Sequence, residues 1–160
     1  MSLPQDLLNQ AKHLASREPK RPRQASLRRA VSTAYYALYH LLAAAGARSM
    51  APAQPTGLRD RVQRAFVHDE MKKVCEQFRQ GNVNNLSPAL QVLITNPLDP
   101  AFTTIADAFV ELQEARHTAD YDVSDTFTRP DVLAKISLVE QAFLDWKTVR
   151  SSSIPSFFQT

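Results

Sequence analysis

The sequence has a single cysteine, no long hydrophobic run and no export signal. Because Cys75 stands alone, an internal disulfide is excluded, and the reducing cytoplasm is the expected location. Its apolar neighbours Val74 and Phe78 favour a buried thiol over a catalytic nucleophile. No apolar run approaches the roughly 18 residues of a membrane-spanning helix, and the first residues lack a basic and then apolar pattern. We therefore expect no membrane partner and no export.

Glycine and histidine are also scarce, which bears on the fold class and on metal chemistry. Only three glycines occur, and apolar residues do not alternate with polar ones as they do in strands, so no sheet is expected. The histidines are too scattered for a metal site, and we expect neither a metal ion nor a cofactor. They are His13, His40, His68 and His117.

The two halves of the chain carry charge of opposite sign. The 160 residues, 44% apolar and 22% charged, have the composition of one soluble globular domain. Residues 1–64 hold 11 Lys and Arg against 3 Asp and Glu, whereas residues 65–160 hold 8 against 13. The basic half suits phosphates, an acidic protein surface or the acidic half of a second copy, although charge runs are usually solvated helix starts. Its densest basic residues are Arg17, Lys20, Arg21, Arg23, Arg28 and Arg29.

Apolar periodicity predicts two helices at the start of the chain. The first spans Leu3–Ala15 with Ser2 as its cap, and the two prolines of segment 18–22 separate it from the next helix. The second carries an apolar stripe from Leu27 to Ala45, and Gly46 is expected to end it. A second stripe adjoins this apolar face at steps of four, three and four, and consists of Arg29, Thr33, Tyr36 and His40.

Three further helices are predicted beyond a proline-rich loop. The third covers residues 58–78 with a break near 67–69, and residues 80–98 are typical of an irregular loop. The fourth begins at Pro100 behind Asp99 as its cap and ends near Ala119. Thr128 is expected to cap the last helix. The inner face of that helix consists of Val132, Ile136, Val139, Phe143 and Trp146.

Together these segments predict an all-α fold. Four long helices and a shorter first one favour an up-and-down four-helix bundle with an additional short N-terminal helix. We expect one domain over residues 1–150 and a mobile C-terminal tail over residues 151–160.

The densest group of polar side chains stands at the end of the fourth predicted helix. The apolar stripe of this helix passes through Leu112, and two further steps of four reach Arg116 and Asp120. A buried charge is costly unless it is paired, so Arg116 needs a partner. In a structural interpretation, Arg116 pairs with Asp120 and bonds Tyr36 or Tyr121. In a functional interpretation, Arg116 binds a phosphate in a pocket shaped by Tyr36, Tyr121 and His40.

Two segments resemble motifs of the HEPN superfamily of helical-bundle domains. Residues 28–40, with the sequence RRAVSTAYYALYH, are similar to the R-A-x-S-x-A-Y-Y-A-x-x-H helix of many small prokaryotic members. Residues 116–122, RHTADYD, are similar to the R-x-x-A-D-Y signature near the end of the penultimate bundle helix. The resemblance implies a single HEPN-like helical domain over residues 1–150, often a homodimer. It also implies one of several functions, which range from a toxin ribonuclease to an antitoxin-linked or nucleotide-binding partner.

The resemblance further bears on catalysis, because catalytic members carry a histidine five residues after the motif arginine. Here Tyr121 occupies that position, and His117 directly follows Arg116. This departure favours a non-catalytic module that binds a nucleotide, an RNA or a partner protein, with a nucleotidyltransferase-like antitoxin as one such partner. The candidate ligand-binding residues are Arg29, Tyr36, His40, Arg116, Asp120 and Tyr121.

The alternative is a metal-independent ribonuclease toxin. It would use Arg116 with His117, His40 or His68, because a histidine and an arginine can deprotonate the 2′-hydroxyl and hold the phosphate. Arg61 and Arg64 lie close enough in sequence to His68 to form a second such pair. The other interpretation of His68 is that it caps or kinks the third helix beside Asp69.

Overall fold

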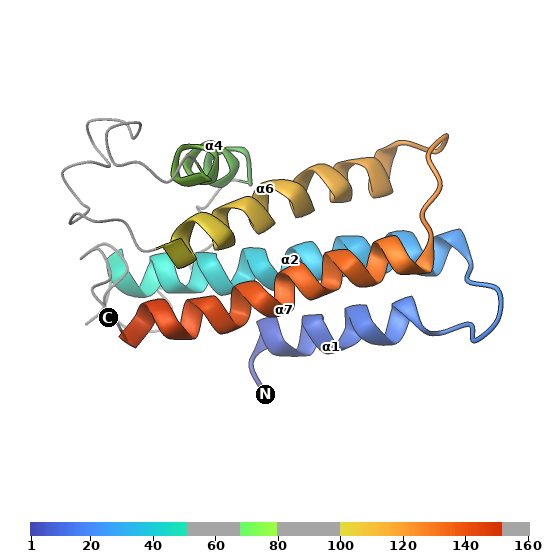
Figure 1. Ribbon diagram of the computed structural model, residues 1–160, viewed down its shortest axis with the longest axis horizontal. Coiled ribbons are helices and arrows are strands. Elements are labelled where there is room, and N and C mark those ends of the chain that lie inside the picture. The colour runs from blue at the N-terminus through green and yellow to red at the C-terminus, as the bar shows by residue number, and fades with distance from the viewer. Residues whose placement is uncertain (51–67, 80–99, 152–160) are drawn as a thin grey trace. The chain divides into compact units, whose positions relative to one another are not determined.

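The computed structural model describes residues 1–50, 68–79 and 100–151, and all regular structure in these ranges is helical (Figure 1). The all-α prediction is therefore confirmed for this part of the chain. Within the same ranges, no helix combines the length and apolarity needed to cross a membrane. The helices are α1 (Leu3–Ala15), α2 (Gln24–Met50), α4 (His68–Arg79), α6 (Pro100–Tyr121) and α7 (Arg129–Ser151).

The chain divides into two compact units. The first unit consists of Met1–His40 and Ala108–Phe143, and the second of Leu41–Asp107 and Leu144–Thr160. Helices α2, α6 and α7 each continue from one unit into the other, whereas α1 belongs to the first unit and α4 to the second. The single domain expected over residues 1–150 stays a prediction.

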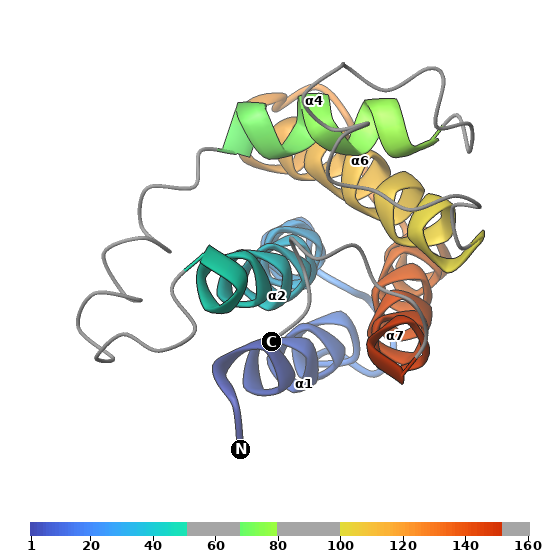
Figure 2. The same ribbon diagram turned by 90° about the vertical axis from the view of Figure 1, so that its left-hand side faces the viewer.

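The first unit is built around the apolar faces of four helical segments. Figures 1 and 2 show α1 lying alongside α2 and α7 in this unit. The rings of Tyr35 on α2 and Phe109 on α6 lie 5.6 Å apart at its centre, and both side chains are fully buried. Fully burying one aliphatic or aromatic side chain stabilises a fold by roughly 1.5–3 kcal/mol. The other large buried side chains of this unit are Leu27, Leu38, Leu112, Ile136, Val31, Val110, Val132 and Val139.

Exposed ion pairs join the helices of the first unit at its surface. Lys12 of α1 lies 3.0 Å from Glu140 of α7, and Lys135 of α7 lies 2.5 Å from Glu111 of α6. Such exposed pairs contribute at most about 1 kcal/mol each. The apolar core, and not these pairs, is therefore the main source of stability in this unit.

The second unit packs α4 against the first turns of α6. The rings of Phe78 and Phe102 stack 5.8 Å apart, and Arg79 forms a 2.7 Å ion pair with Asp107. Cys75 is buried, and burial raises the pKa of its thiol to about 12. The burial of Cys75 confirms the prediction of a core cysteine.

The structure confirms the predicted starts of α1 and α7 but not the predicted end of α2. Ser2 accepts the backbone N–H of Gln5 at 3.5 Å, and α1 has the predicted bounds. Thr128 accepts the N–H of Asp131 at 3.3 Å, as expected of the cap of α7. The prediction that Gly46 ends the second helix is wrong, because α2 continues to Met50. One glycine costs a helix only about 1 kcal/mol relative to alanine, which the neighbouring alanines of α2 offset.

Several predictions lie outside the described residues. They concern the first half of the third helix, the loop over residues 80–98, the cap at Asp99 and the tail beyond residue 151. Where α6 is described, Pro100 is its first residue as predicted, and the helix ends at Tyr121, two residues beyond Ala119.

Candidate functional site

Arg116 lies near the end of α6 and faces two tyrosines of α2. Its guanidinium carbon is 5.4 Å from the ring centre of Tyr35 and 5.7 Å from that of Tyr36. Its Nη2 donates a hydrogen bond of 3.5 Å to the hydroxyl of Tyr36. Only 15% of the Arg116 side chain is exposed. A cation over aromatic faces is stabilised by about 0.5–2 kcal/mol, and more strongly when it is shielded from water.

Asp120 balances the charge of Arg116 from one turn further along α6. Its Oδ2 lies 3.3 Å from Nε of Arg116 and accepts a hydrogen bond of 3.3 Å from the hydroxyl of Ser32 on α2. Among the described residues, the Nε–H of Arg116 has no hydrogen-bond acceptor with suitable geometry, so its attraction to Asp120 is that of an ion pair and not of a directed hydrogen bond. This pairing is the one that the structural interpretation of Arg116 predicts.

Arg28 covers the C-terminal end of α6, where the last carbonyls have no partner within the helix. Its Nη1 donates to the carbonyl of Ala119 at 2.9 Å and to that of Asp122 at 2.8 Å, and its Nη2 donates to the carbonyl of Asp125. The cation also faces the negative end of the α6 dipole, which adds a favourable electrostatic interaction. Its guanidinium carbon lies 5.6 Å from the ring centre of Phe127, so the arginine is held on two sides.

These contacts form one continuous interface, which we call the α2–α6 contact. The contact residues of α2 are spaced about four positions apart. Their partners on α6 occur in the opposite order, because the two helices run antiparallel. Tyr36 meets Arg116, Ser32 meets Asp120, and Arg28 meets the last turn of the helix. The two sequence motifs therefore contact each other in three dimensions. The contact consists of Arg28, Ser32, Tyr35, Tyr36, Arg116 and Asp120.

His40 lies one turn beyond Tyr36 at the edge of this contact. Its ring is 6.3 Å from that of Tyr36 and 5.2 Å from that of Tyr39. Burial lowers the pKa of His40, so its imidazole stays neutral to a lower pH than a solvated histidine. Its Nδ1 is buried without a hydrogen-bond partner among the described residues.

Three other candidate residues lie on the surface. The rings of His117 and Tyr121 contact each other at 5.1 Å along α6, and Tyr121 is 65% exposed. Five residues of helix rotate Tyr121 by about 140° away from Arg116, which explains why it does not join the α2–α6 contact. Arg29 is exposed on α2, next to the arginine that makes the helix-end contacts. In the described part of the chain, none of the three hydrogen-bonds to Arg116 or Asp120.

His68 begins α4 and belongs to the second unit. In the ribonuclease alternative, His68 would pair with Arg61 or Arg64. Both arginines lie outside the described residues. Over residues 1–50, 68–79 and 100–151, no three His, Cys, Asp or Glu side chains come together as they would around a metal ion.

Comparison of the chain with family models, with curated proteins and with solved structures finds no match. The resemblance to HEPN domains therefore rests on the two motifs that meet in the α2–α6 contact.

Three residues of the contact are not among the site residues predicted from the sequence, namely Arg28, Ser32 and Tyr35, although Tyr35 lies in the core as its apolar stripe predicts. Positions 28, 32 and 36 lie on one stripe of α2 at steps of four, but the steps of four, three and four through Arg29 fit the helical period equally well. The sequence also places a small polar residue, Ser32, among apolar neighbours, and the structure buries it to 2% exposure. A buried serine needs a hydrogen-bond partner, and here that partner is Asp120.

Proposed function

We propose that the chain is a HEPN-like protein that binds a nucleotide, an RNA or a partner protein in the cytoplasm without turning it over. We further propose that its helices form an up-and-down four-helix bundle with an additional short N-terminal helix. The observation that supports the non-catalytic part of this proposal is the engagement of Arg116 with Asp120, Tyr35 and Tyr36.

The surroundings of Arg116 argue against catalysis. Metal-free RNA cleavage needs a base at the 2′-hydroxyl and a cation that is free to stabilise the phosphate. The charge of Arg116 is already offset by Asp120, whose carboxylate would also repel a phosphate. The adjacent His117 is exposed, and its ring pairs with Tyr121. A structural role for Arg116 therefore fits its contacts better than a catalytic one.

The proposed partners follow from the resemblance and from the charge distribution. A homodimer could bring the basic half of one copy against the acidic half of another, because residues 1–64 are strongly basic and residues 65–160 are acidic. A nucleotidyltransferase-like antitoxin is the second proposed partner.

An RNA-cleavage assay tests the proposal. We expect the purified full chain to leave labelled single-stranded RNA intact in EDTA, as judged on a denaturing gel. Arg116→Met and His117→Ala proteins, prepared in the same way, serve as matched controls for contaminating nucleases. Cleavage by the parent that Arg116→Met abolishes, with an unchanged circular dichroism spectrum, would establish the alternative ribonuclease function.

A further inference from the structure

We infer that the connection between α1 and α2 binds the phosphate backbone of a double-stranded nucleic acid. This connection, which we call the basic turn, covers residues 16–23 and carries the exposed side chains of Arg17, Lys20, Arg21 and Arg23. The inference rests on the proposed binding function and specifies the class of partner.

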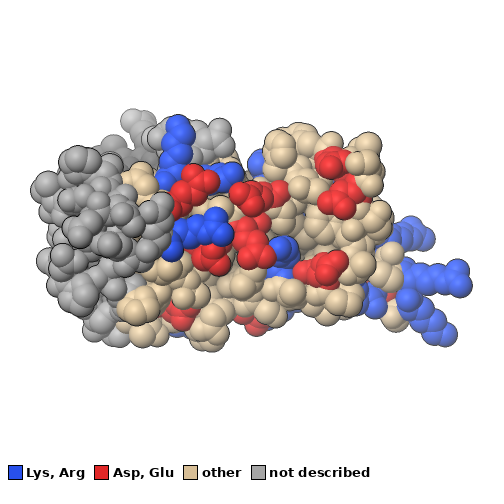
Figure 3. Space-filling model, turned by 45° about the horizontal axis from the view of Figure 1, so that its top comes forward, with Lys and Arg blue, Asp and Glu red and all other residues tan. Residues whose placement is uncertain are grey.

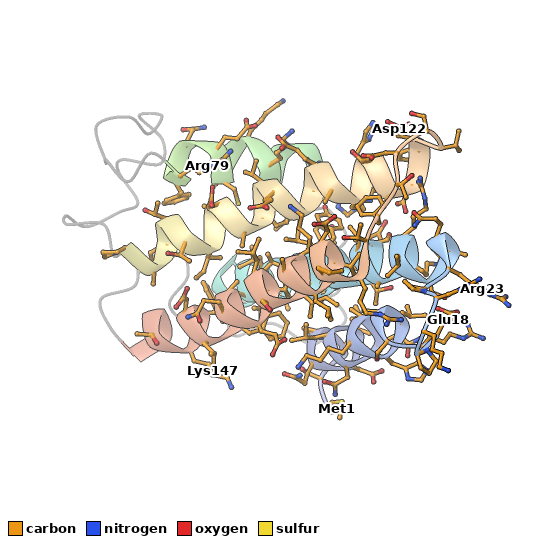
Figure 4. The ribbon with its side chains drawn as sticks, turned by 45° about the vertical axis from the view of Figure 1, so that its right-hand side comes forward. Met1, Glu18, Arg23, Arg79, Asp122 and Lys147 are labelled. Atoms are coloured by element: carbon orange, nitrogen blue, oxygen red, sulfur yellow. The ribbon has the colours of Figure 1, made fainter. Side chains whose placement is uncertain are left out.

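The cations of the basic turn are exposed to solvent. In the part of the chain that the structure describes, none of the four forms an ion pair. Figure 3 shows Lys and Arg side chains extending from the right-hand end of the molecule, where α1 and α2 connect in Figure 1. Figure 4 shows Arg23 pointing outward at this end. A cluster of unpaired cations repels itself and attracts a polyanion.

The one acidic side chain of the basic turn is engaged within the protein. The carboxylate of Glu18 accepts a hydrogen bond of 2.8 Å from the hydroxyl of Ser26 and one of 3.4 Å from the backbone N–H of Arg23. It therefore stabilises the junction with α2, and it attracts Arg17 and Arg23 electrostatically without forming an ion pair with either among the described residues.

The backbone of the basic turn is held from α7. The Arg129 guanidinium donates to the carbonyls of Ala15 at 3.0 Å and Pro19 at 3.1 Å, and also to the carbonyl of Glu18. Proline rings at positions 19 and 22 restrict the backbone further. A backbone that is ordered before binding loses less conformational entropy in the complex.

The composition around these cations distinguishes between classes of partner. Residues 16–29 contain no aromatic residue, whereas single-stranded nucleic acids are held by stacking on aromatic rings. Protein interfaces also need large apolar or aromatic anchors, and the exposed positions of the basic turn are charged except for Ser16 and Pro19. Arginine is suited to phosphate because its planar guanidinium can donate two parallel hydrogen bonds. Phosphates of a duplex, bound without reading of its bases, fit this surface best.

Among the described residues, the acidic side chains that follow α6 form no ion pair with the basic turn. The Asp122 carboxylate accepts hydrogen bonds from the N–H and the hydroxyl of Ser124, and that of Asp125 accepts the N–H of Thr126. Figure 4 shows Asp122 apart from Arg23 and Glu18.

Fluorescence anisotropy with labelled 20-base-pair RNA and DNA duplexes tests the inference on the full chain. With about four phosphate contacts, we expect the logarithm of the binding constant to fall with the logarithm of salt at a slope of about −4. The combined variant Arg17→Gln, Lys20→Gln, Arg21→Gln and Arg23→Gln should bind at least about tenfold more weakly and lose most of that slope. Tighter binding of the RNA or of the DNA duplex shows which nucleic acid supplies the phosphates, and either result supports the inference.

A matched variant controls for net charge. Lys12→Gln, Lys72→Gln, Lys73→Gln and Lys147→Gln together remove the same number of cations elsewhere and should weaken binding less than about threefold. Equal weakening by both variants, or binding of single strands or polyglutamate as tightly as duplexes, would overturn the inference. Denaturing gels of the same samples report RNA cleavage separately, so failure of the non-catalytic proposal is distinguishable from failure of the basic turn.

Discussion

Replacing Arg116 by alanine is expected to lower the free energy of unfolding by about 2–4 kcal/mol. The substitution removes the cation from the rings of Tyr35 and Tyr36 and leaves Asp120 without its charge partner. It also leaves a space beside Tyr35, which is fully buried. Urea denaturation followed by circular dichroism at pH 7 measures the loss.

Two variants show whether this loss comes from the contacts of Arg116. Arg29→Ala removes an exposed arginine of α2 and should change stability by less than about 0.5 kcal/mol. Arg116→Lys keeps the charge but loses the planar surface, so we expect an intermediate loss. An Arg116→Ala protein as stable as the parent would contradict a structural role for this residue.

Arg28→Met is expected to lower the free energy of unfolding by about 2–3 kcal/mol. Methionine keeps much of the apolar stem of arginine but cannot donate hydrogen bonds to the carbonyls of Ala119, Asp122 and Asp125. Water replaces some of these donors, which is why the expected loss is smaller than for a fully buried group. The last turn of α6 should therefore open more often, and hydrogen exchange of its amides should accelerate.

The matched control for Arg28 is Arg21→Met in the basic turn. Arg21 is exposed and forms no ion pair within the described residues, so its replacement should leave both stability and the exchange of α6 unchanged. If Arg28→Met behaved like this control, the helix-end contacts would contribute nothing to the fold.

Local sequence signals predicted the helix starts well. Ser2 and Thr128 cap α1 and α7 because a hydroxyl that accepts a backbone N–H acts within one turn of chain. The end of α2 was predicted wrongly because Gly46 has only a small intrinsic cost, which the rest of a long helix can offset.

The candidate site was predictable within one helix and less so between helices. The four-residue step from Arg116 to Asp120 gave the ion pair, and Tyr36 was correctly named among the partners of Arg116. Periodicity along α2 does not reveal which of two adjacent arginines faces α6, so the sequence predicts Arg29 where the structure has Arg28. That choice depends on the register between the helices, which only the packed structure provides.

If the two motifs hold α2 and α6 together in the first unit, a double-mutant cycle across the two helices shows it most directly. The cycle combines Arg116→Ala with Tyr36→Leu, because these residues come from different helices, whereas Arg116 and Asp120 share one. We predict a coupling energy of about 1 kcal/mol between the two substitutions. Additivity within about 0.3 kcal/mol would contradict the claim.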